Sequence, residues 1–448
     1  NYKFHKIKIK REGNKKKMFQ PTIKINTSWK NEISWTVVMI FLINMFIKNE
    51  QQVMAYMALI VTLFMLYKKI VLPEIPGFTL YFISIIIMFF YGIFVNDIAE
   101  FVKGTFYVIN NIVIVVVAYY ACRYEKGKSM IKTIYLSCMV LLVSDWIKLV
   151  LKIGEISTLG SLRDVFNKNI MDILMFSVLL FYECILNKQS IYGKNKDRIC
   201  MIVAFVTVLI SLGRTQILCL IIGILVAYVI SIIKENKKQR LFVNLIVSFA
   251  IGAILVFLTF LILPDDVTTP FVEKVENSFT EISSDNKFED EASISSNWRG
   301  YENKNAMEQW KNAETWEELF GQGMGVKIKL KSLPELHKKV YSLTDDSTPL
   351  LHNGFYTLLV KGGLFALVSL FIWLLYPLRV FRKQVQHRYE VEVYGEMLIM
   401  NIMMIATMYV IRGLVGSGTF AVWAIVIGWN SCRLRQSFSY SNERLFRR

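Results

Sequence analysis

The chain has 448 residues, of which 54% are hydrophobic and only 19% are charged, and its formal net charge is +17. A soluble chain of this length would carry about 25% charged residues. Twelve apolar runs of about 20 residues would account for roughly 240 residues of this chain, which excludes a soluble enzyme with a tail anchor. The apolar residues form runs of about 17–25, the length of a membrane-spanning helix, whereas strands of a membrane β-barrel are about half as long. The sequence therefore predicts an all-α polytopic membrane protein.

Twelve spans are predicted in chain order. They cover residues 33–48, 51–67, 78–95, 105–122, 132–151, 170–187, 199–213, 217–233, 242–263, 351–377, 394–411 and 417–432. Lys and Arg accumulate in alternate connections, and cytoplasmic connections are the ones enriched in these residues, so both termini are predicted to be cytoplasmic. The first thirty residues are basic and have no apolar core, so we expect no cleavable signal peptide.

This topology divides the chain into five parts. They are a basic cytoplasmic segment (1–32), spans one to nine (33–263), a large extracytoplasmic loop (264–350), spans ten to twelve (351–432) and a basic cytoplasmic tail (433–448). Topology alone explains the basic termini beside an anionic membrane surface, so no nucleic-acid partner is expected.

The loop 264–350 differs in charge from the rest of the chain. It contains 17 acidic and ten basic residues, whereas the remainder contains 18 acidic and 42 basic residues. Loops of this length are usually functional or disordered. We expect residues 281–287 to be flexible. From Trp298 to Trp316, the spacing of aromatic and apolar residues predicts an amphipathic helix along the outer membrane face.

Four arginines lie on the predicted outer side, where the positive-inside rule makes cations scarce. They are Arg163, Arg214, Arg299 and Arg412, each at or near a predicted helix end, and so they can converge at one depth. Guanidinium groups form paired hydrogen bonds with phosphate oxygens. The alternative is that they extend to lipid headgroups or pair with carboxylates of the loop.

His352 is the second candidate, because it lies where the loop returns to the membrane. A neutral imidazole can accept a proton from a sugar hydroxyl, and the unperturbed pKa of histidine is about 6.5. The alternative is a helix-capping or hydrogen-bonded interfacial histidine.

Four further ionisable residues lie in or near spans. Asp145 and Lys148 are three residues apart in span five and are expected to form an ion pair, with a proton or ion relay as the alternative. Asp172 and Lys361 lie near helix ends and are expected to extend to the interface. No Asp-x-Asp pair or His/Cys cluster has metal-ligand spacing, so no metal site is expected.

Four stretches together resemble the O-antigen polymerase/ligase superfamily of bacterial membrane glycosyltransferases. They are Arg163 with Phe166, Asn167 and Asn169; Ser211-Leu212-Gly213-Arg214; Arg299 with the closing glycines Gly321, Gly323 and Gly325; and residues 352–356 followed by Gly362-Gly363. The twelve-span layout with a large loop before span ten is also similar. Two residues depart from the family pattern, since Gly213 stands where serine is common and Lys361 where an acidic residue is common.

The resemblance implies a GT-C-like architecture and an inverting glycan transfer from an undecaprenyl-pyrophosphate carrier, without metal or cofactor, at the outer face of the bacterial cytoplasmic membrane. Arg214 and Arg299 would bind the diphosphate and stabilise its charge, and His352 would be the general base. The further substrate-binding candidates are Arg163, Asn167, Asn169, Asn353 and Arg412.

The resemblance leaves two functions open. A capsule or O-antigen polymerase would use a lipid-linked donor and a lipid-linked acceptor, and would work with a chain-length regulator. A ligase would transfer finished glycan to a lipid, protein or wall acceptor. Outside this family, a transporter of lipid-linked sugar would need ionisable residues along a central path, where mainly Asp145 and Lys148 qualify. A purely structural membrane protein would leave the outer arginines unexplained.

Overall fold

A computed structural model describes residues 32–68, 72–166, 169–235, 265–277, 288, 291–331, 346–383, 388–416, 418 and 420–446. This part of the chain is mainly helical, and the strands found in it are β1 (Ile328–Lys329) and β2 (Ser347–Thr348), which pair antiparallel. The all-α prediction is therefore confirmed. The predicted span 242–263, the segment 281–287 and Asn167 lie outside the described residues.

The helices follow one another along the chain in three groups. The first group is α1 (Trp35–Phe46), α2 (Asn49–Tyr67), α3 (Thr79–Val95), α4 (Ile98–Tyr124), α5 (Met130–Lys152), η2 (Ile153–Glu155), α6 (Leu159–Phe166), α7 (Ile170–Leu180), η3 (Phe181–Leu186), α8 (Lys194–Ile210) and α9 (Arg214–Glu235). The second group, in the loop 264–350, is α11 (Asp265–Glu276), α12 (Glu291–Ser296), α13 (Trp298–Lys311) and α14 (Thr315–Phe320). The third is α16 (Gly354–Lys383), α17 (Arg388–Ile411) and α18 (Ala421–Phe446).

Every predicted span within the described residues coincides with a helix. In this part of the chain, five helices (α4, α5, α9, α16 and α17) are long and apolar enough to cross a membrane, and a sixth span results if α6 and α7 with η3 form one span bent by 67°. Helices α1, α2 and α3 are apolar but shorter. The chain is thus an integral membrane protein, while twelve spans and a GT-C-like layout stay predictions.

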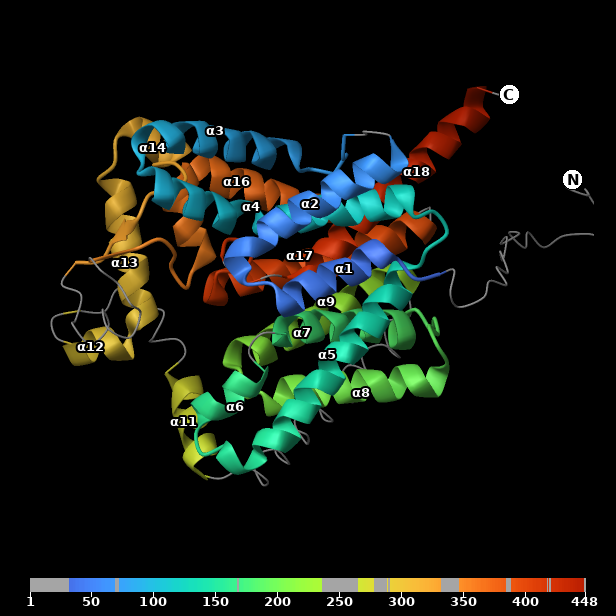
Figure 1. Ribbon diagram of the computed structural model, residues 1–448, viewed down its shortest axis with the longest axis horizontal. Coiled ribbons are helices and arrows are strands. Elements are labelled where there is room, and N and C mark those ends of the chain that lie inside the picture. Colours follow the sequence, from blue (N-terminus) through green and yellow to red (C-terminus); the bar gives the residue numbers. More distant parts are fainter. Residues whose placement is uncertain are drawn as a thin grey trace, which may run out of the picture.

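The core of the bundle lies where α18 packs along α4, with α16 and α17 beside them (Figure 1). Gly428 allows the close approach of these helices, because a Cβ atom there would lie 2.1 Å from the carbonyl oxygen of Val115. The loop helices α11 to α14 and α6 gather at one end of the bundle, and α18 ends at the other (Figure 1). The predicted tail from residue 433 continues α18 to Phe446.

The glycine-rich segment 321–325 is a turn that is inserted between α3, α4 and α16. The backbone N–H of Met324 donates to the carbonyl of Met88 at 3.0 Å, and that of Gly323 donates to the carbonyl of Lys361 at 2.9 Å. The backbones pack so closely that a Cβ atom on Gly323 would lie 2.6 Å from Cα of Gly92. Gly363 interrupts the helical geometry of α16 with φ 65° where this segment packs. These contacts fix the large loop on the membrane helices.

We expect Gly323→Ala to release this contact. Gly323 has φ +84°, so alanine there is strained and its Cβ would collide with Gly92. The expected cost is about 1–3 kcal/mol, seen as a lower unfolding temperature in detergent and as faster tryptic cleavage in the loop. Gly127→Ala is the matched control, because Gly127 has φ +80° but no atom lies within 4 Å of its added Cβ. Equal behaviour of the two variants would contradict the prediction.

Two predictions about charged side chains are wrong. Lys361 does not extend to the interface but is fully buried, and its Nζ donates to the carbonyl of Val326 at 2.7 Å. Asp172 is also buried, and its Oδ1 accepts the backbone N–H of Val422 at 3.0 Å. Both side chains find polar partners inside the protein, and so they have no need to reach water.

The predicted helix from Trp298 to Trp316 is also corrected. It is divided by residues 312–314 into α13 and α14. Helix α13 packs against α16 and β1, and its buried side carries the polar residues Glu302, Asn303 and Asn305 as well as Trp298 and Tyr301. The aromatic spacing indicated a helix correctly, but this buried side is partly polar and is in contact with protein.

Candidate active site

Arg163 on α6 holds the turn that precedes α9. Its Nη2 donates to the carbonyl of Leu212 at 2.8 Å, and Leu212 has an unusual positive φ of 45°. Helix α9 then begins at Arg214, so this contact fixes where the second arginine emerges. The Nε of Arg163 is buried and has no hydrogen-bond partner among the described residues. A buried donor of this kind favours an acceptor group supplied by a ligand.

The structure brings three of the four predicted arginines together. Arg214 and Arg299 lie close enough to Arg163 for their charges to act on it. The three residues come from α6, α9 and α13, which are far apart in the sequence. A guanidinium group within electrostatic range of two others favours an anion with several oxygens, which a diphosphate provides.

His352 is bound by a carboxylate that the sequence interpretation missed. Its Nδ1 lies 3.0 Å from Oε2 and 3.1 Å from Oε1 of Glu302, and its backbone N–H donates to Oε2 at 2.9 Å. The Glu302 side chain is 4% exposed, whereas that of His352 is 27% exposed. A carboxylate on Nδ1 fixes the orientation of an imidazole and directs Nε2 to the reacting group.

Glu302 lies one turn after Arg299 on α13, so a single helix supplies both an arginine of the cluster and the partner of His352. The spacing of three residues after Arg299 is the only sequence signal that could have identified Glu302. That signal is weak, since the loop 264–350 contains 17 acidic residues.

Hydrogen bonds from Arg412 hold the backbone of Leu351 and His352 in position. Its backbone N–H donates to the carbonyl of His352 at 2.7 Å, and its Nε donates to the carbonyl of Leu351 at 3.0 Å. Arg412 has φ 74°, a conformation that non-glycine residues rarely adopt. Gly354 permits this turn, because a Cβ atom there would lie 2.3 Å from the carbonyl oxygen of Arg412. These contacts position the histidine, and a direct role in substrate binding stays a prediction.

The two described asparagines among the candidates have structural contacts. The Oδ1 of Asn353 accepts the backbone N–H groups of Phe355 and Tyr356 at 3.0 and 3.4 Å, so Asn353 caps α16. Asn169 is buried at the start of α7, close enough to the Asp145 carboxylate to act on it electrostatically. The predicted ion pair of Asp145 with Lys148 is confirmed at 3.0 Å. Substrate binding by Asn169 and Asn353 thus stays a prediction, and Asn353 also has the observed capping role.

We expect Asn353→Ala to cost about 1 kcal/mol of stability, because it removes the side chain that caps α16. The measurement is the unfolding temperature in detergent. Asn353→Asp keeps an oxygen acceptor at the cap and should retain the stability. If Asn353→Asp is as unstable as Asn353→Ala, the capping role is refuted.

The described residues contain no group of three or more His, Cys, Asp and Glu side chains that could hold a metal ion. All six cysteines are free thiols.

A comparison of the chain with models of known protein families gives a match that covers several residues of the candidate site. The family model of O-antigen ligases matches residues 199–371. The match contains Arg214, Arg299, Glu302 and His352, whereas Arg163 and Arg412 lie outside it. It confirms the resemblance that the sequence motifs indicated. No curated protein matches the chain.

Proposed function

We propose that this chain, a member of the O-antigen polymerase/ligase superfamily, polymerises a surface polysaccharide such as capsule or O-antigen. In this proposal, glycan linked to undecaprenyl pyrophosphate is transferred to a lipid-linked repeat unit at the outer face of the cytoplasmic membrane, and a chain-length regulator is the expected protein partner. The observation that carries the proposal is the bond between Glu302 and His352, one helical turn from an arginine of a three-arginine cluster.

His352 would act as the general base. Its Nε2 would accept the proton of the acceptor hydroxyl while that oxygen attacks the anomeric carbon of the donor glycan. The bond between this carbon and the phosphate oxygen would break with inversion. A general base contributes typically 10²–10⁴ in rate. Glu302 would hold the proton of the imidazole on Nδ1 and stabilise the imidazolium that forms.

The arginine cluster would bind the leaving group. As the bond breaks, negative charge develops on the diphosphate, and fixed guanidinium groups stabilise such charge without reorganisation. The buried Nε of Arg163 would gain a phosphate oxygen as its acceptor. The proton taken up by His352 would return to solvent, and the carrier diphosphate would depart with its lipid. No step in this proposal uses a metal or a cofactor.

A ligase is the second candidate, and the description of the matching family favours it. The chemistry at the donor would be the same in a ligase, because only the acceptor differs: a lipid, protein or wall component in place of a lipid-linked repeat unit.

The length distribution of the surface glycan distinguishes these functions. A deletion strain is complemented with the wild type, with Arg214→Ala, Arg299→Ala or His352→Ala, or with Lys311→Ala as a control from the exposed end of α13. For a polymerase, the site variants should accumulate a single repeat unit on the carrier. For a ligase, they should accumulate a full ladder on the carrier. An unchanged ladder in all three site variants would refute the catalytic assignment.

A further inference from the structure

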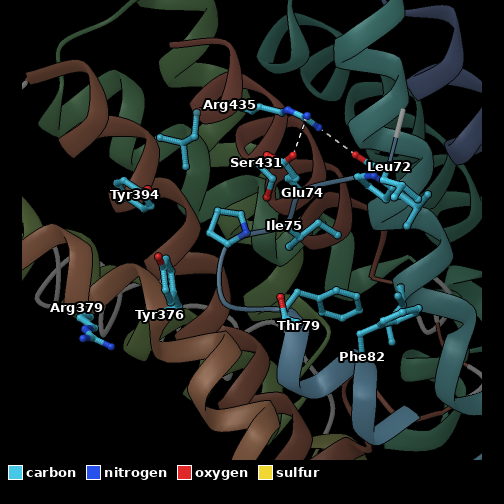
Figure 2. A pocket seen from close by; sticks show the side chains of 16 residues that line it. Leu72, Glu74, Ile75, Thr79, Phe82, Tyr376, Arg379, Tyr394, Ser431 and Arg435 are labelled. Carbon is cyan, nitrogen blue, oxygen red and sulfur yellow. Dashed lines mark hydrogen bonds and ion pairs between the residues drawn. The ribbon is translucent and has the colours of Figure 1, made fainter. Parts of the chain in front are cut away.

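A pocket lies at the opposite end of α16 from His352. It has a volume of about 900 Å³ and is bounded by the segment before α3 and by α3, α4, α16, α17 and α18 (Figure 2). Helix α16 connects the two regions, with His352 before its first residue and Arg379 near its other end. The two residues are 27 positions apart, which at a helical rise of 1.5 Å per residue corresponds to roughly 40 Å along the helix. The pocket is thus separate from the candidate active site.

The interior of this pocket is apolar. Ile112 and Leu434 are buried at its inner side, next to the partly buried Val116. Toward the outside, the side chains of Leu72 and Phe82 also line it, and they are 80% and 49% exposed. In an integral membrane protein, exposed apolar side chains of this kind face lipid. On the side of Phe82 the pocket would therefore open toward the acyl region of the membrane.

Charged side chains line the rim of the pocket at two places. Figure 2 shows Arg379 beside Tyr376 on one side, and Arg435 with Glu74 at the other. Arg435 is held in place, because its Nη2 lies 2.7 Å from Oε1 of Glu74 and its Nη1 donates to the carbonyl of Leu72 at 3.1 Å. The side chain of Arg379 is exposed. Two arginines and one glutamate give the lining a net charge of +1.

We propose that this pocket binds an anionic glycerophospholipid. An apolar chain on the ligand would match the apolar interior, and one negative charge would match the net charge of +1. A phospholipid with a single phosphodiester has both. Its phosphate would lie at Arg379 and the hydroxyl of Tyr376, and an acyl chain would cover Val116 and Phe82. Arg379 and Arg435 belong to segments that the charge pattern places on the cytoplasmic side, where basic pockets between membrane helices bind anionic lipid headgroups.

The test is native mass spectrometry of the full chain, purified in mild detergent and incubated with equal amounts of phosphatidylglycerol and phosphatidylcholine. We expect the wild type to retain phosphatidylglycerol preferentially. Arg379→Gln should reduce the retained phosphatidylglycerol about tenfold, since it removes a charge-assisted hydrogen bond to phosphate. Lys126→Gln, an exposed cation outside the pocket, is the matched control and should behave like the wild type.

A second variant tests the apolar part of the pocket. Val116→Trp places a large side chain in the interior and should lower the retention of both lipids, while the thermal unfolding profile shows whether the variant is folded. Equal retention of the two lipids by the wild type would overturn the proposal, as would undiminished phosphatidylglycerol retention by Arg379→Gln. The glycan ladder is a separate measurement, so failure here leaves the proposed function untouched.

Discussion

Replacement of His352 by alanine is expected to lower the initial rate of glycan transfer by about 10²–10⁴, the usual contribution of a general base. The measurement uses membranes that contain the variant, with lipid-linked repeat units as substrate. Added imidazole should restore part of the rate in His352→Ala, because a small base can enter the space that the side chain vacates. A rate within about threefold of the wild type would contradict the assignment.

Glu302→Gln tests the same assignment through the partner of the histidine. Glutamine keeps the shape of the side chain but loses the charge that stabilises the imidazolium. We expect a rate reduction of about 10–100-fold, smaller than that of His352→Ala. Glu308→Gln is the matched control, because Glu308 lies on the same helix and pairs with Lys331. If the two glutamine variants have equal rates, Glu302 does not support catalysis.

Removal of an arginine from the cluster is the second large effect. Arg299→Ala is expected to lower the transfer rate by about 10²–10³, because one fixed charge is lost where the diphosphate becomes more negative. Arg299→Lys should restore only part of the rate, since lysine retains the charge but cannot donate the paired hydrogen bonds of a guanidinium group. Imidazole should not rescue Arg299→Ala, and this separates its role from that of His352.

Lys304→Ala is the control for this variant, because it removes another cation from the same helix, α13. The Lys304 ammonium group lies 5.4 Å from the centre of the Phe288 ring, and Lys304 is not one of the three arginines of the cluster. Arg214→Ala should behave like Arg299→Ala. A full rate in both alanine variants would show that the cluster does not bind the leaving group.

The sequence by itself determined the class of the protein and the positions of its long apolar helices. Hydrophobicity and helix length are local properties, and therefore each predicted span within the described residues coincides with a helix. The scarcity of cations on the predicted outer side is also visible within short segments of the sequence. For that reason Arg163, Arg214 and Arg299 could be selected before their proximity was known.

Only the tertiary structure decided which side chains meet. The bond between Glu302 and His352 joins residues that are 50 positions apart, and the bond from Arg412 to Leu351 joins residues 61 positions apart. No local pattern specifies such pairs. The burial of Lys361 depends in the same way on a carbonyl 35 residues away, which the glycine-rich segment 321–325 brings into the bundle. Chain composition thus determines which segments enter the membrane, whereas the environment of each polar group depends on contacts between distant segments.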